Sequence, residues 1–199
     1  MTIFFLLIDL FLFVGALLLA RRSYNLSEQK DQRACMVISL ASVFIACSAA
    51  GSLLIYLPAQ EVQTLKLMLD NLAFFAGIPF IASAFVDLAW NLKWSKPAWG
   101  RWLLALFALF EVTRRADFGA QYSQIMAVLT VIALVVSLLK TPSPLARIPG
   151  ITAAIFFAVS LLVFSQGSLI PSLQNSIGSH FFLGISLFML SATLRKSRI

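Results

Sequence analysis

The chain has few charged residues. Only 12% of its 199 residues are Asp, Glu, Lys or Arg, whereas 60% are hydrophobic. Soluble globular domains carry about 25% charged and about 45–50% apolar residues. Because so little charge cannot cover a surface exposed to water, the composition excludes a soluble globular protein. It predicts instead that many apolar side chains face lipid.

Histidine and cysteine are also scarce. His180 is the single histidine, which excludes a haem held by two histidines. Cys35 and Cys47 lie twelve residues apart in one apolar run, about 18 Å along a helix, so they cannot form a disulfide with each other. No metal-type spacing is present, and the last apolar run has no Lys for a retinal Schiff base. We therefore expect no cofactor and no metal.

Seven apolar runs are present instead. They cover about residues 3–20, 34–57, 65–90, 99–112, 122–139, 149–170 and 173–194. Several approach or exceed the roughly 18–20 residues that cross a bilayer as a helix. Backbone groups cannot stay unpaired in hydrocarbon, and the runs are too long and continuous for barrel strands. The sequence thus predicts an all-α, polytopic integral membrane protein of the cell (inner or plasma) membrane, with seven transmembrane helices in a single domain, residues 1–199.

The Lys and Arg residues between these runs alternate in number. Twelve of the 15 lie in the first, third and fifth loops and at the C-terminus: Arg21, Arg22, Lys30, Arg33, Lys93, Lys96, Arg101, Lys140, Arg147, Arg195, Lys196 and Arg198. The other three are Lys66, Arg114 and Arg115. Because cytoplasmic loops carry an excess of Lys and Arg, this predicts an N-terminus outside and a cytoplasmic C-terminus. Short basic clusters between apolar runs are orientation signals, so we expect no nucleic-acid partner.

All four tryptophans surround the third loop. They are Trp90, Trp94, Trp99 and Trp102. Tryptophan concentrates at the membrane–water interface, where its ring is apolar and its N–H is wet. We expect these residues to form an anchoring belt on the cytoplasmic side.

Two short sequence segments each have a similar counterpart later in the chain, at nearly the same offset. Residues 52–56 and 160–164 are similar at an offset of 108, and residues 74–78 and 181–185 at an offset of 107. This favours two parallel three-helix units, residues 1–95 and 120–199, joined by a linker helix at 97–116. Chance likeness between apolar helices is the alternative. The 3+1+3 layout resembles that of SWEET-type sugar facilitators; their Pro-Gln signature is absent, so no binding residue is carried over.

Polar residues inside the apolar runs gather in the predicted outer half. A charged side chain at the membrane centre costs about 2.5–3.5 kcal/mol on insertion scales, so each needs a compensating partner or a function. The candidate site residues are Asp9, Asp70, Asn71, His180, Arg114 and Glu111. They predict a cavity open to the outside that binds a small polar solute or a proton, because histidine changes charge near physiological pH.

Each of these residues also has a purely structural interpretation. Asp9, Asp70 and His180 would then join helices to one another through hydrogen bonds. Glu111 lies three and four residues before Arg114 and Arg115, the spacing of an ion pair on a helix surface.

Three functions remain open at this point. The first is a small-solute transporter or facilitator. The second is a membrane-embedded enzyme acting on a lipid or an isoprenoid, with His180 and an aspartate as its base; zinc motifs and a nucleophile elbow are absent from the sequence. The third is a membrane sensor or an accessory subunit of a membrane complex. The lipid bilayer is the partner common to all three.

Overall fold

The protein is all-helical over the part of the chain that the computed structural model describes, residues 2–30, 32–54, 60–140 and 143–196. The elements are α1 (Thr2–Lys30), α2 (Arg33–Leu54), α3 (Gln60–Leu72), η1 (Ala73–Gly77), α4 (Ile78–Trp90), α5 (Lys96–Arg115), α6 (Gly119–Leu139), α7 (Pro144–Val159), η2 (Ser160–Phe164), η3 (Pro171–Leu173) and α8 (Ser176–Lys196). The segments η1 and η2 are π-helical, and η3 is a 3₁₀ turn. Since α3, η1 and α4 form one rod and α7 and η2 another, these ranges contain seven rods. The predicted all-α class is confirmed.

Six of the rods in the described ranges are long and apolar enough to cross a membrane. They are α1, α2, the α3–α4 rod, α6, the α7–η2 rod and α8. They indicate a multi-pass membrane protein. The seventh rod, α5, falls short because it carries Lys96, Arg101, Glu111, Arg114 and Arg115. A membrane crossing by α5, and the orientation of the chain, therefore stay predictions.

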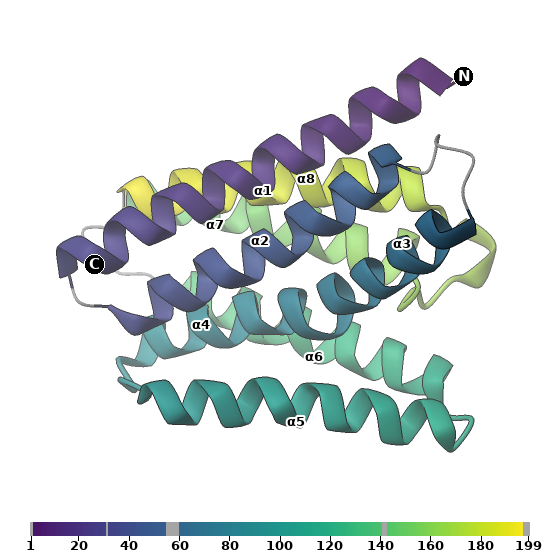
Figure 1. Cartoon of the computed structure of the whole chain (residues 1–199). Helices are drawn as coiled ribbons and strands as arrows, with labels where there is room; N and C mark the ends of the chain where they lie inside the picture. The colour runs from purple at the N-terminus through teal and green to yellow at the C-terminus, as the bar shows by residue number, and fades with distance from the viewer. Residues whose placement is uncertain (1, 31, 55–59, 141–142, 197–199) are drawn as a thin grey trace.

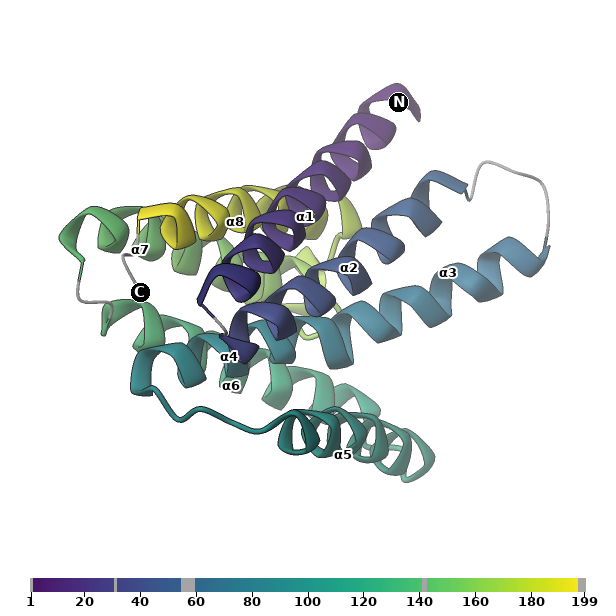
Figure 2. The same cartoon turned by 60° about the vertical axis from the view of Figure 1, so that its left-hand side comes forward.

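The six apolar rods form a closed ring. Successive members are in contact in the order α1, α2, α4, α6, α7, α8, and α8 packs back onto α1. The helix α5 lies outside this ring, against α6 and η1 (Figures 1 and 2). Small residues on α2, among them Ala41, Ala46 and Ala49, are buried and allow close helix packing. The ring leaves α5 with a peripheral position.

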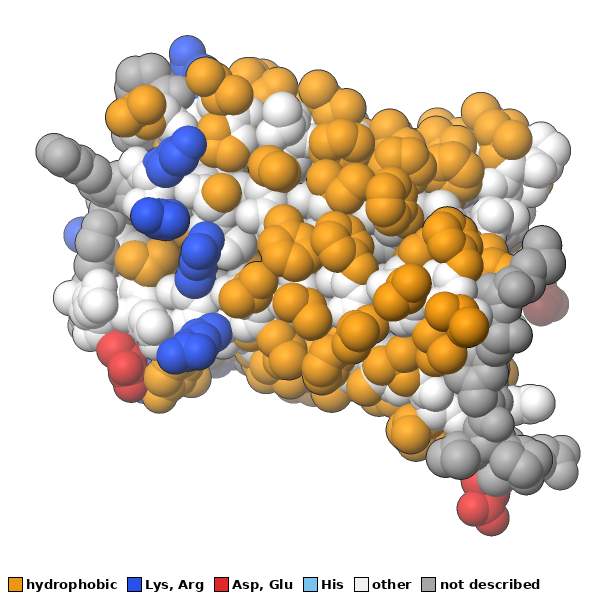
Figure 3. All heavy atoms as spheres, turned by 90° about the horizontal axis from the view of Figure 1, so that it is seen from above, with side chains coloured by type: hydrophobic (Ala, Val, Ile, Leu, Met, Phe, Trp, Pro, Cys, Tyr) orange, Lys and Arg blue, Asp and Glu red, His pale blue; other side chains and the backbone are white. Residues whose placement is uncertain are grey.

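Neighbouring rods run in alternating directions, so the loops collect at two ends of the molecule. We call the end with residues 21–30, 32–33, 91–101, 140, 143–147 and 195–196 the basic end, and the other the opposite end. Figure 3 shows Lys and Arg side chains gathered at one end of a broad apolar face. Arg198, also predicted on this side, lies outside the described residues.

Two helix ends differ most from the sequence prediction. The first helix does not end near residue 20 but continues to Lys30. Arg22 Nη1 donates to the carbonyl and hydroxyl oxygens of Ser191, at 3.0 and 2.9 Å, and the buried Ser23 donates to the Leu19 carbonyl. The predicted sixth helix ends at Phe164 instead of residue 170, and the chain then follows an irregular loop. The predicted end of the second helix at residues 55–57, with the break at Pro58, lies outside the described residues.

The prediction of an interfacial tryptophan belt is wrong for Trp99. Its side chain is only 4% exposed and packs edge-on against Phe80, with ring centroids 5.5 Å apart. Trp94 also packs against it, with ring centroids 4.9 Å apart. The indole of Trp102 donates to Ser83 Oγ at 3.0 Å. These contacts are possible because α5 folds back beside α4, so its first turns face protein rather than lipid.

The π-helical segment η1 precedes Pro79. Proline lacks an N–H and its ring clashes with the carbonyl four residues earlier, so a regular α-helix is disfavoured there. A single wider turn relieves this clash without ending the rod. Residues 74–77 are thus π-helical while residues 181–185, their counterpart in the predicted repeat, are regular α-helix. The repeat itself stays a prediction.

Candidate functional site

The first of the two acids in the candidate site is Asp9. It lies on α1, and its Oδ1 is 2.6 Å from Nδ1 of His180 on α8. The two side chains are 13% and 18% exposed. An ionised carboxylate only accepts hydrogen bonds, so Nδ1 donates and Nε2 is the nitrogen left for another group. The packing of α1 on α8, which closes the ring, therefore brings together residues that are 171 positions apart.

The second acid, Asp70 on α3, has different partners. It forms an ion pair with Lys66, one helical turn earlier, and Ser48 Oγ on α2 donates to its Oδ1 at 2.6 Å. Neither Lys66 nor Ser48 was among the sequence candidates. The i,i+4 spacing of Lys66 and Asp70 is a signal that could have found the lysine. Ser48 carries no such signal, because it comes from a different helix.

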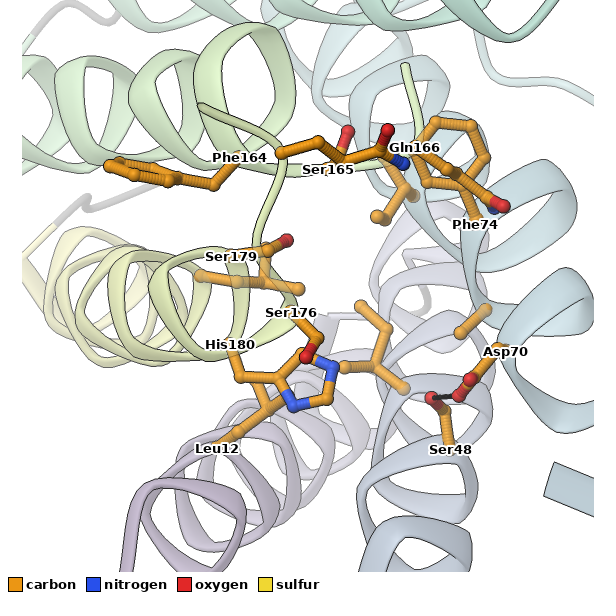
Figure 4. A pocket seen from close by; sticks show the side chains of 15 residues that line it. Leu12, Ser48, Asp70, Phe74, Phe164, Ser165, Gln166, Ser176, Ser179 and His180 are labelled. Atoms are coloured by element: carbon orange, nitrogen blue, oxygen red, sulfur yellow. Dashed lines mark hydrogen bonds between the residues drawn. The ribbon is translucent and has the colours of Figure 1, made fainter. Parts of the chain in front are cut away.

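Both acid–base pairs face open space at the opposite end. A first cavity of about 200 Å³ is lined by His180, Asp70 and Ser48. Figure 4 shows His180 and Ser176 on one side of this cavity, with the Asp70–Ser48 pair across from them. Polar groups of different helices thus converge on one space.

A second cavity adjoins the first. It has a volume of about 230 Å³ and is lined by Asp9 and Lys66, together with Ser52. His180 and Ser176 line both cavities. The Lys66–Asp70 pair therefore contributes one member to each cavity, while His180 of the Asp9–His180 pair lines both and forms part of the wall they share.

The loop between η2 and α8 covers the first cavity. Ser165 and Gln166 line it from this loop (Figure 4). The loop is held by Asn175 N, which donates to the Phe164 carbonyl at 2.9 Å, and by Gln124 Nε2, which donates to the Ser168 carbonyl at 3.2 Å. The two π-helical segments reach the same place, since Phe74 of η1 and Phe164 of η2 both line the cavity. Such segments are frequent at functional sites.

Three of the sequence candidates lie elsewhere. Asn71 lines neither cavity, although it follows Asp70 directly. Glu111 and Arg114 lie on α5, outside the ring. Arg114 Nη2 and Arg115 Nε donate to Glu111 Oε1 at 2.9 and 2.6 Å. The predicted ion pair on the helix surface is confirmed, and these residues do not border the cavities.

The arrangement suits binding rather than metal chemistry. Within the ranges that the structure describes, no three His, Cys, Asp or Glu side chains come together in a way that could hold a metal ion. In the same part of the chain, no serine is hydrogen-bonded to His180. What the site offers is a cation, two carboxylates, an imidazole and several hydroxyls around a small space.

Comparison with known proteins gives no match, whether with protein families, with curated proteins or with solved structures.

Proposed function

We propose that this membrane protein is a small-solute transporter or facilitator. Its solute enters from the opposite end and binds between the Asp9–His180 pair and the Lys66–Asp70 pair. The observation that carries the proposal is that both pairs line the same two adjoining cavities, of about 200 and 230 Å³, with His180 common to both.

The cavities favour this proposal over a purely structural role for the charges. Ionisable groups within membrane helices are rare, and they mark solute and ion pathways when they face a cavity. Side chains that only join helices pack tightly, because protein interiors leave few voids larger than a water molecule. Asp9, His180, Lys66 and Asp70 are instead satisfied by one another and still border open space.

The lining also limits the kind of solute. Lys66 and the imidazole of His180 suit an anionic or hydrogen-bond-accepting group, while Asp9 and Asp70 suit a cationic or donating group. A small polar solute with both kinds of group would engage both pairs at once. Irregular helix segments at the binding level are common in transporters, and η1 and η2 supply them here.

The test is uptake into proteoliposomes containing the purified full chain. Radiolabelled glycine, acetate, methylammonium and glycerol serve as zwitterionic, anionic, cationic and neutral probes, and trapped pyranine reports proton entry. We expect at least one probe to enter faster than in protein-free liposomes. Asp70→Asn and His180→Gln should each slow this uptake by about ten-fold or more, since each removes a charge-assisted contact.

The matched control is Glu111→Gln, which changes the same kind of charge on α5, away from the cavities. It should leave uptake unchanged. Uptake of all probes at the protein-free rate, or equal slowing by Glu111→Gln, would contradict the proposal.

A second candidate is an enzyme, and one contact favours it. Asp9 fixes the orientation of His180 through Nδ1, as is required of a histidine that acts as a general base through Nε2. Incubation of the protein with membrane lipids, followed by mass spectrometry of the products, tests this function. Product formation that His180→Gln abolishes would replace the transporter proposal.

A further inference from the structure

A separate groove lies at the basic end, away from the candidate site. It has a volume of about 280 Å³ and is bordered by residues of α2, α4 and α5. Its floor is formed by Phe80 and Trp99, which are almost fully buried. Its α2 side carries Met36 and Leu40, which are 54% and 44% exposed. In a membrane protein these two exposed side chains face lipid, so the groove is open to the bilayer.

Two cations stand at this groove. Arg33 begins α2 and Lys96 begins α5, and both side chains are exposed. Neither forms an ion pair with any residue that the structure describes, and among the described residues that line the groove none is acidic. The N-terminus of α5, a 20-residue helix, adds the partial positive charge of its first turn at the same place. The groove therefore combines apolar walls with positive charge.

Trp99 adds an unused donor. Its Nε1 is buried and has no hydrogen-bond acceptor among the described residues. Buried donors nearly always have a partner, because an unpaired one costs about 1–3 kcal/mol.

We propose that this groove binds an anionic phospholipid. The headgroup phosphate lies between Arg33 and Lys96, and an acyl chain runs along Met36 and Leu40. Basic pockets between transmembrane helices on the cytoplasmic side recognise anionic headgroups in this way, and the basic end is the predicted cytoplasmic side. The groove is too small for a partner helix, whose diameter with side chains is about 10–12 Å. Its apolar walls suit a lipid better than a free anion.

The experiment is native mass spectrometry of the full chain in mild detergent. It is titrated with phosphatidylglycerol or with phosphatidylcholine of the same acyl chains. We expect preferential binding of phosphatidylglycerol, and an affinity reduced about five-fold for each cation removed in Arg33→Gln/Lys96→Gln. Arg33→Lys/Lys96→Arg keeps both charges and should retain binding.

The matched control is Arg195→Gln/Lys196→Gln, which removes two exposed cations from the same end, on α8, outside the groove. It should bind phosphatidylglycerol like the unaltered chain. The proposal is overturned by equal binding of the two lipids, by equal weakening in the control, or by millimolar inorganic phosphate displacing phosphatidylglycerol. This inference does not depend on the proposed transport function.

Discussion

Asp9 and Asp70 lie at the same end of the bundle but are compensated by chemically different groups. The partner of Asp70 is a lysine on its own helix, so their ion pair is local. The partner of Asp9 is an imidazole from the far end of the sequence. Only the second contact depends on the closure of the ring, and it therefore links the chemistry of the site to the fold.

Removal of Asp9 should destabilise the protein through His180. In Asp9→Ala the largely buried imidazole loses its acceptor, which costs about 1–3 kcal/mol of the free energy of unfolding. In a His180→Ala background the same substitution should cost at least about 1 kcal/mol less, because the two residues act as a pair. Denaturant unfolding in detergent, followed by tryptophan fluorescence, measures both values. Additive effects of the two substitutions would show that the contact contributes nothing.

The exposed ion pair on α5 should behave differently. Glu111→Gln removes an interaction between side chains that are 40% and 59% exposed in the Glu111–Arg114 pair. Exposed pairs contribute little, since water and salt screen them. We expect no measurable change in the midpoint of thermal unfolding, recorded in the same detergent. A clear drop would mean that α5 is held to the ring through this pair.

At the scale of elements, the loop of residues 165–175 is the least predictable part of the site. It leaves η2 in an extended conformation at Ser165 and dips toward α6 and η1. A Cβ atom at Gly167 would lie 2.7 Å from the Ser123 carbonyl oxygen and 2.9 Å from a ring atom of Phe74. Only glycine allows this close approach, which keeps the loop over the first cavity.

Gly167→Ala should therefore displace the loop. Overpacking of this kind costs about 1–3 kcal/mol of the free energy of unfolding, and the displaced loop should expose the cavity to solvent. Gly119→Ala is the control, because a Cβ there meets nothing within 4 Å. Hydrogen exchange should show faster exchange of the amides of residues 166–170 in Gly167→Ala only. Equal exchange in both variants would contradict the role of this loop.

The presence of the helices could be predicted from the sequence more readily than the positions of their ends. Apolar runs predict helices because hydrocarbon accepts no unpaired backbone, but they carry no signal for where a helix continues into water. Within the extension of α1 to Lys30, Arg22 donates to Ser191, a contact between the first and last helices. In the same way, the sequence predicts that the two acids and His180 lie at one depth in the membrane. The Asp9–His180 contact and the hydrogen bond from Ser48 to Asp70 could not be predicted, because they depend on how different helices pack.

At the scale of the whole molecule, the topology depends on whether α5 crosses the membrane. It is the rod outside the ring, and it is not apolar enough to be recognised as membrane-spanning by composition. Its length of 20 residues, about 30 Å as a helix, is nevertheless sufficient to cross. If it crosses, the basic end lies wholly on one side of the membrane.

Cysteine labelling in cells separates these possibilities. In a Cys35→Ala/Cys47→Ala background, Leu92→Cys and Ala116→Cys place a thiol at exposed positions on either side of α5. We expect a membrane-impermeant maleimide to label Ala116→Cys in intact cells and Leu92→Cys only after permeabilisation. Labelling of both from the same side would show that α5 does not cross.

The proposed function requires that polar groups of α1, α2, α3 and α8 surround a space that is open to solvent on the outside. Ser179 lines the first cavity on α8, and Phe181, two residues later, is 42% exposed on the lipid-facing surface. In the same cysteine-free background, an impermeant thiosulfonate reagent applied outside should modify Ser179→Cys and spare Phe181→Cys, because thiolates do not form in hydrocarbon. Reaction of Ser179→Cys no faster than that of Phe181→Cys would contradict the account.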